Sequence, residues 1–179
     1  MTTSIEDTTI AYRQFIERLA DSQLDQRIPN GKPAHAAILF ETMFKKAKDT
    51  VRIFTGDLLR EAYGTQELLQ SAKSAVERGV RVQILLQHKQ DRAWMVAQPL
   101  IETVMHNGRL PSNIEIRCAI EPYSNSAKHF AVMDHVGYRF EVDHAHCKAF
   151  ANFNEPGVAS NLARAFDAAF STAVGLSLQ

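Results

Sequence analysis

Apolar residues recur at helical spacing close to the start of the chain, with polar residues on the opposite side. This stripe is formed by Ile5, Tyr12, Phe15, Ile16 and Leu19. The residues that follow break the pattern with turn formers, namely Pro29, Asn30, Gly31 and Pro33. The pattern therefore predicts an N-terminal helix and linker over residues 1–30. It also predicts that the apolar stripe of this helix needs a partner surface.

Helical and strand patterns alternate from residue 34 onward. The stretch "AHAAILFETMFKKAKD" predicts an amphipathic helix, and "TVRIFTG" predicts a short strand rich in β-branched residues. The stretch "TQELLQSAKSAVERG" predicts a second helix, whose Gly79 suits the left-handed position after a helix end. The buried strand "VRVQILL" follows at once. This order is typical of a parallel βαβ unit.

The second half of the chain predicts a further helix, four more strands and a closing helix. Residues 91–108 are expected to be helical, with an interruption at Pro99 and an end near Gly108. The four strand patterns are "NIEIRCAI", "HFAVMD", "GYRFEV" and "CKAFANF". The final stretch "PGVASNLARAFDAAFSTAV" has a strong helical stripe, and Pro156 fits its first turn.

The charge balance and the cysteine content bear on whether the protein binds nucleic acid or membranes and on where it is located. Twenty basic and twenty acidic side chains cancel, so no overall field attracts nucleic acid or an anionic membrane. The first residues are polar and acidic, unlike a secretory signal, and no apolar run has the length of a membrane span. Cys118 and Cys147 are too few for a disulfide framework. A cytoplasmic protein is expected.

Four stretches together resemble the phospholipase D-like superfamily, which includes lipases, small nucleases and nuclease-like effector domains. They are "ILFETMFKKAKDTVRIFTGDLL", "LLQSAKSAVERGVRVQILL", "HFAVMD" and "NFNEPGVASNLARAFDAAF". The resemblance implies an α/β fold over residues 31–179, with a mixed sheet flanked by helices. The N-terminal helix is an addition to that fold.

The superfamily's catalytic motif is H-x-K-x-x-x-x-D-x-x-x-x-x-x-G-S-x-N. The resemblance implies that two such motifs face each other, with one histidine as nucleophile and the other protonating the leaving oxygen. The lysine and asparagine stabilise the charge of the phosphoryl group. This chemistry requires no metal and no cofactor. Since the chain carries one motif region, the resemblance also implies a homodimer.

Aligning the motif on Asp134 places Ala127 where the family has its nucleophilic histidine. His129 then falls at the lysine, and His144 at the asparagine. Glu141 and Val142 occupy the Gly-Ser positions. Alanine offers no nucleophile, so the alignment predicts a catalytically degenerate domain. Such a domain would act as a binding or regulatory subunit for a phosphate-bearing ligand or a protein partner. By analogy with relatives of the fold, a protein partner would be encoded in the same bacterial operon.

Two alternatives remain open at this point. In the first, His129 and His144 rebuild a metal-independent phosphodiesterase or nuclease site that a second subunit completes. In the second, His144, His146 and nearby acids bind a metal, although no second Cys/His pair stands at zinc-finger spacing. The candidate ligand-binding residues are Lys128, Arg139, Asp134 and Glu141.

Overall fold

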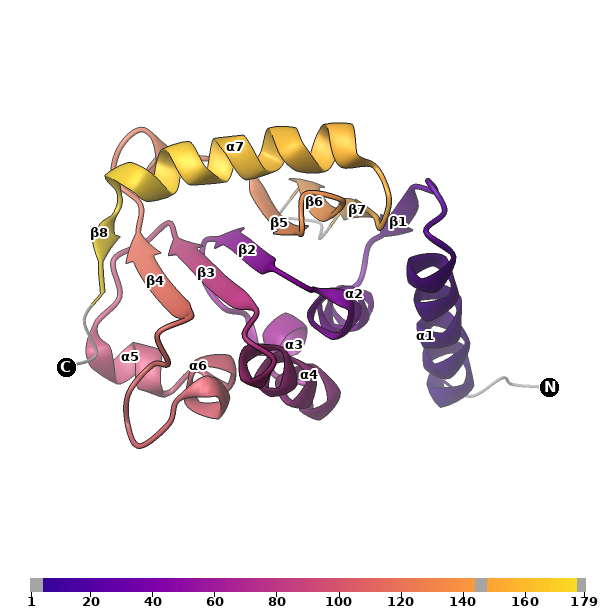
Figure 1. The fold of residues 1–179 in the computed structure, drawn as a ribbon, viewed down its shortest axis with the longest axis horizontal. Coiled ribbons are helices and arrows are strands. Elements are labelled where there is room, and N and C mark those ends of the chain that lie inside the picture. The colour runs from indigo at the N-terminus through magenta and orange to yellow at the C-terminus, as the bar shows by residue number, and fades with distance from the viewer. Residues whose placement is uncertain (1–4, 144–147, 177–179) are drawn as a thin grey trace.

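The computed structural model describes residues 5–143 and 148–176 (Figure 1). The helices are α1 (Ile5–Ser22), α2 (Pro33–Lys46), α3 (Arg60–Tyr63), α4 (Gln66–Glu77), α5 (Arg92–Val96), α6 (Pro99–Val104) and α7 (Pro156–Thr172). The strands are β1 (Ile28–Asn30), β2 (Thr50–Thr55), β3 (Arg81–Leu86), β4 (Ile114–Cys118), β5 (His129–Met133), β6 (Gly137–Asp143), β7 (Lys148–Asn152) and β8 (Val174–Gly175).

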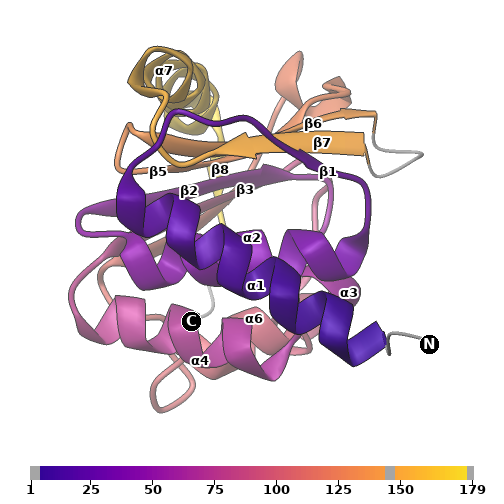
Figure 2. The ribbon, with the colours of Figure 1, turned by 90° about the vertical axis from the view of Figure 1, so that its right-hand side faces the viewer.

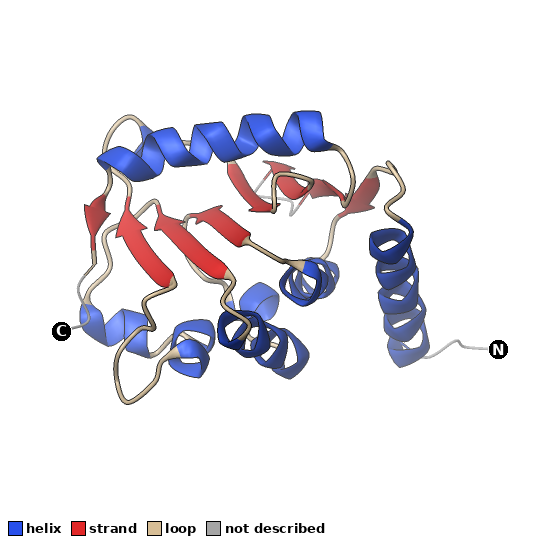
Figure 3. Cartoon of the chain, in the orientation of Figure 1, coloured by secondary structure: helices blue, strands red, loops and turns tan. Residues whose placement is uncertain are grey.

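All of the described strands lie in one mixed sheet, in the order β1-β7-β6-β5-β2-β3-β4-β8. Strands β2, β3 and β4 run parallel to one another, as the βαβ pattern predicts. Strand β5 joins them antiparallel through β2, and β6 and β7 continue antiparallel beyond it. The predicted mixed sheet flanked by helices is confirmed, and Figure 3 separates its strands from the surrounding helices by colour.

Helices cover both faces of the sheet (Figures 1 and 2). The long α7 lies on one face, and α2, α3, α4 and α6 lie on the other. Strand β5 is regular, so its side chains alternate between the two cores. Phe130 and Val132 pack with α7, whereas Ala131 and Met133 belong to the core beneath α2. His129, by the same alternation, lies on the α2 face.

Several local predictions are confirmed. Helices α5 and α6 are separate because Pro99 begins the second of them. Gly79 has a φ of +90°, in the left-handed region that follows a helix end. Pro156 stands in the first turn of α7, where its missing N–H costs nothing.

The expected linker contains a strand that the sequence does not reveal. Residues 28–30 form β1, which pairs antiparallel with β7. The short α3 and β8 were also not expected. Pro29 and Asn30 are turn formers, so the local sequence does not predict β1. A three-residue strand forms because it pairs with its neighbour rather than because of its own propensity.

Helix α1 packs on α2 within the same chain. Ile16 and Leu19 are buried there, and the Arg13 guanidinium lies 3.1 Å from the Glu41 carboxylate on α2. The apolar stripe therefore finds the partner surface that the sequence predicts inside the same chain. None of the helices described combines the length and apolar character that a bilayer-spanning segment needs.

Candidate functional site

Four residues form a row across the sheet on the face that α2 covers. His129 on β5 stands opposite Glu141 on β6, Glu141 opposite Ala149 on β7, and Ala149 opposite Asn30 on β1. Three of the four carry polar side chains, and each of these is at most 9% exposed. Arg139 precedes Glu141 by two residues on β6, so its side chain lies on the same face of the sheet.

Hydrogen bonds and ion pairs link these side chains in sequence. The Arg139 Nε donates to Asn30 Oδ1 at 3.0 Å, and Arg139 Nη2 lies 3.4 Å from Glu141 Oε1. The other carboxylate oxygen, Oε2, lies 3.4 Å from His129 Nδ1. The buried charges of Arg139 and Glu141 are thus paired, as burial of charge requires.

His129 continues the chain of contacts to Gln87, which directly follows β3. Its Nε2 lies 2.7 Å from Gln87 Oε1. The Gln87 amide nitrogen donates to the carbonyl of Ser126, so its oxygen is the atom that faces the imidazole. His129 Nε2 must therefore carry the hydrogen and donate it. The opposite ring nitrogen, Nδ1, faces the Glu141 carboxylate.

Gly56 lies beside the contact between His129 and Gln87 and leaves room for it. It follows β2, the strand that lies between β5 and β3 in the sheet. A Cβ at this position would lie 3.3 Å from Gln87 Oε1 and 3.5 Å from His129 Nε2. The absence of a side chain leaves the two polar groups room to meet.

His129 separates two hollows. On one side a cavity of about 40 Å³ lies beneath α3, with Phe40, Tyr63 and Arg139 among its walls. On the other side a cleft of about 750 Å³ opens at the strand ends. Its lining residues are Gly56, Asp57, Gln87, His88, Ser124, Asn125, Ser126, Ala127, His129, Val142 and Asp143. The cleft has the volume of a small-molecule or side-chain binding site.

Burial changes the ionisation of two tyrosines near Arg139. It raises the pKa of Tyr63, although the nearby Arg139 charge and the Thr55 hydroxyl act in the opposite direction. It also raises the pKa of Tyr12 to about 12. Both phenols are therefore neutral at physiological pH, and neither adds charge to the row.

The structure brings together only some of the residues predicted from sequence. His129, Arg139 and Glu141 are in contact, while Ala127 and Lys128 are exposed where the chain enters β5. Ala127, which the motif alignment places at the nucleophile position, is among the residues that line the cleft. His144 and His146 lie outside the described residues.

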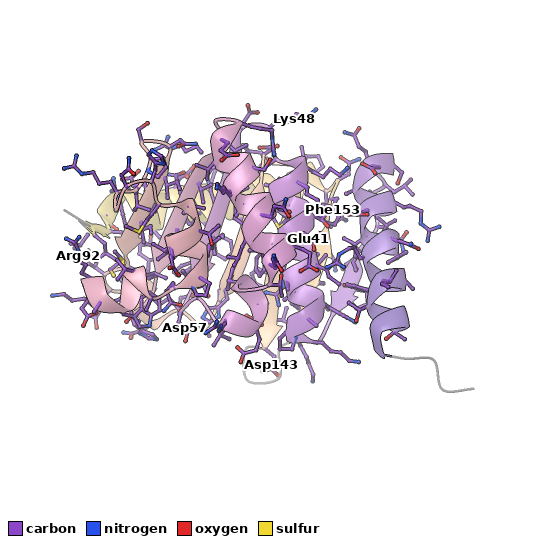
Figure 4. All side chains as sticks on the ribbon, turned by 90° about the horizontal axis from the view of Figure 1, so that it is seen from below. Glu41, Lys48, Asp57, Arg92, Asp143 and Phe153 are labelled. Carbon is purple, nitrogen blue, oxygen red and sulfur yellow. The ribbon has the colours of Figure 1, made fainter. Side chains whose placement is uncertain are left out.

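Asp134 lies at the other end of β5, away from the cleft. Its carboxylate accepts hydrogen bonds from the backbone N–H groups of Lys48, Asp49 and Thr50, at 2.7, 2.9 and 2.7 Å. Figure 4 labels Lys48 at one end of the molecule, and Asp57 and Asp143 at the opposite end. Asp134 therefore braces the turn after β5 against the start of β2. Asp134 and Glu141, both candidate ligand-binding residues, therefore lie at opposite ends of the β5–β6 hairpin.

Sequence reasoning missed three residues of this site. Gln87 is a polar residue at the end of a buried strand, which is the one local signal that could have indicated it. Asn30 and Gly56 resemble ordinary turn residues in the sequence. Among residues 5–143 and 148–176, no group of three or more histidine, cysteine, aspartate or glutamate side chains is arranged to hold a metal ion.

Solved structures define the class of fold. Nuc from Salmonella typhimurium, a phospholipase D family member, is 15% identical with a TM-score of 0.57, over 86% of this chain and 99% of its own. NucT from Helicobacter pylori is 11% identical with a TM-score of 0.57, over 86% of this chain and 100% of its own. The archaeal chromatin protein TrmBL2, solved for its novel mode of DNA binding, is 15% identical with a TM-score of 0.62, over 96% of this chain and 64% of its own. The fold is phospholipase D-like.

The family assignment is more specific. The model of the family described as a domain of unknown function, DUF7931, matches residues 32–177, and the chain belongs to that family. The match begins after β1, so α1 and β1 precede it. No curated protein matches the chain.

Proposed function

We propose that this protein is a catalytically degenerate phospholipase D-like domain that binds a partner through the cleft beside His129. The observation that carries the proposal is Ala127. It lines the cleft at the position where the family's motif has its nucleophile, and a methyl group cannot attack phosphorus. A cleft of about 750 Å³ lies beside it, which favours binding without turnover.

The environment of His129 also supports a loss of catalysis. Its side chain is 9% exposed and lies between Gln87 and Glu141. A nucleophilic histidine needs an unprotonated nitrogen that can approach phosphorus. Here Nε2 donates its hydrogen to an amide oxygen, and Nδ1 faces a carboxylate.

The lining of the cleft favours a protein partner over a phosphate-bearing ligand. Within the described part of the chain it contains two carboxylates, Asp57 and Asp143, and no lysine or arginine. An anion would meet like charge there and would lack the cations that usually bind phosphate. Polar amides and hydroxyls, together with the half-exposed Val142, suit a peptide surface better.

Hydrolysis of a chromogenic phosphodiester by the purified chain in EDTA tests the proposal. The expected result is no turnover above buffer, with or without added metal. Turnover that persists in EDTA and disappears in both His129→Ala and His144→Ala would contradict it. Inorganic phosphate should leave the backbone NMR signals of Gln87 and Ser126 unshifted, and saturable shifts would favour the phosphate-bearing ligand.

A second candidate is a metal-independent phosphodiesterase or nuclease with a rebuilt site. The contact between His129 Nδ1 and Glu141 Oε2 favours it, because a carboxylate behind an imidazole orients catalytic histidines. Completion by a second subunit would make activity depend on the homodimer. Activity per chain that falls on dilution, together with a matching change of mass in sedimentation, would support this candidate. A location in the cytoplasm remains a prediction.

A further inference from the structure

The N-terminal segment, residues 5–30, contacts the rest of the chain through buried apolar side chains, strand pairing, ion pairs and hydrogen bonds. Ile16, Leu19 and Ile28 are buried in the core beneath α2. Strand β1 adds to the edge of the sheet. Ion pairs add to the contact, and their members are Arg13–Glu41, Arg13–Glu67, Lys45–Glu17, Lys46–Asp21 and Arg27–Glu155. Asn152 and Asn154 also donate hydrogen bonds to the segment, at the Asp25 carboxylate and the Gln23 carbonyl.

Most of these ion pairs involve side chains that are a third or more exposed. Exposed pairs contribute little and are screened by salt. Strand β1 has one strand neighbour and three residues. Buried apolar side chains therefore anchor the segment, while its ion pairs and its short edge strand add little. An element with such a periphery opens more easily than the centre of the sheet.

The segment nevertheless supplies a buried hydrogen-bond acceptor to the site. Asn30 is 3% exposed, and its Oδ1 accepts from Arg139 Nε at 3.0 Å. Arg139 is itself 6% exposed, and its charge lies 5.4 Å from the centre of the Phe40 ring. Release of the segment would remove an acceptor from a guanidinium that has little access to water.

From Arg139 the contacts run without a break to the cleft. Glu141 connects Arg139 to His129, and His129 connects Glu141 to Gln87. Gln87 and His129 are both walls of the cleft. Each member has a fixed partner on either side, so a change at Asn30 alters the position of the next group and of the one after it.

We propose that the N-terminal segment regulates the cleft, with Asn30 as the positioning residue. When the segment is docked, Asn30 holds Arg139 and, through Glu141, the His129–Gln87 wall. When the segment is released, Arg139 reorients toward water or Glu141, and the wall loses its fixed geometry. The inference rests on the proposed function only in taking the cleft as the binding site.

The test compares two substitutions of Asn30 in the full-length chain by NMR of the histidine ring signals. Asn30→Leu keeps the branched outline of the side chain and removes the acceptor, whereas Asn30→Asp keeps an acceptor for Arg139. In Asn30→Leu the His129 ring signals should shift, and exchange of the Gln87 side-chain amide hydrogens should speed up at least tenfold. In Asn30→Asp both should stay near wild type. Asn154→Ala is the matched control, since Asn154 also contacts the segment, at the Gln23 carbonyl, but lies outside the row.

Unchanged His129 signals in Asn30→Leu would overturn the inference, as would equal shifts in the Leu and Asp variants. If Asn30→Leu does not fold, Asn30→Thr replaces it, because threonine suits a strand and its hydroxyl is too short to reach Arg139. These measurements use neither turnover nor a ligand. The regulatory inference can therefore fail while the proposed function stands, and the reverse also holds.

Discussion

His129 reaches Gln87 across the end of a strand that lies between them in the sheet. The 2.7 Å contact passes over Gly56, which has no side chain to block it. In the motif alignment His129 stands at the position of a phosphate-binding lysine. Here the same position carries a side chain that holds the wall of the cleft together.

Gly56→Ala should weaken this contact. The added Cβ would lie 3.3 Å from Gln87 Oε1 and 3.4 Å from His129 Cε1, so one of the two must move. Overpacking of this kind costs about 1–2 kcal/mol of unfolding free energy, measurable by urea denaturation. Gly157→Ala is the control, because a Cβ there meets nothing within 4 Å, and it should leave stability unchanged or slightly higher. Equal effects of the two changes would contradict the steric account.

Asp134→Ala should destabilise the fold without reaching the cleft. Its carboxylate accepts from three backbone N–H groups at the start of β2. Because the site is half-buried, water can replace some of these hydrogen bonds. We therefore expect the free energy of unfolding, measured by urea denaturation, to fall by about 2–3 kcal/mol. Asp134→Asn should recover part of the loss because it retains one oxygen. A loss below about 0.5 kcal/mol, ordinary for a surface change, would count against the bracing role.

Glu41→Ala should loosen α1. The Glu41 carboxylate is 2% exposed and lies 3.1 Å from Arg13 Nη2 and 2.7 Å from Lys45 Nζ. Burial by itself lowers the pKa of Lys45, but hydrogen bonds to Glu41 and Glu17 raise it overall. Arg13 and Lys45 can both turn to water once the carboxylate is gone. We therefore expect the free energy of unfolding to fall by about 1–3 kcal/mol. Amide exchange should increase first in α1, whereas the exposed Glu77→Ala should have no such effect.

Alkaline pH should destabilise the protein through its tyrosines. Burial raises the pKa of both Tyr12 and Tyr138 to about 12, and for Tyr138 its hydrogen bond to Glu155 acts in the same direction. The folded state thus holds these protons more tightly than the unfolded state, whose phenols titrate near 10. The stability is fully present below pH 10 and is lost as pH rises toward 12. The melting temperature should fall above pH 10, and less steeply in Tyr138→Phe; a flat profile to pH 11.5 would contradict this.

The sequence predicts the large elements well because each has its own pattern. The stripe over α7, the apolar run in β5 and the break at Pro99 are local properties. By contrast, β1 exists through its pairing with β7, and no pattern within "IPN" indicates it. The site divides in the same way. Glu141 opposite His129 follows from one hairpin, whereas Asn30 and Gln87 arrive from distant parts of the chain and depend on the order of strands.

The strand order also determines which strands lie at the edges of the sheet, where another chain could pair with them. Within the described residues, the two outermost strands have three and two residues, and Pro29 removes an N–H from one of them. Short edge strands, one of them carrying a proline, offer few backbone groups with which another chain could pair. This protects a sheet against aggregation. A second molecule would therefore recognise side chains on the helices or at the strand ends, where the cleft opens, rather than extend the sheet.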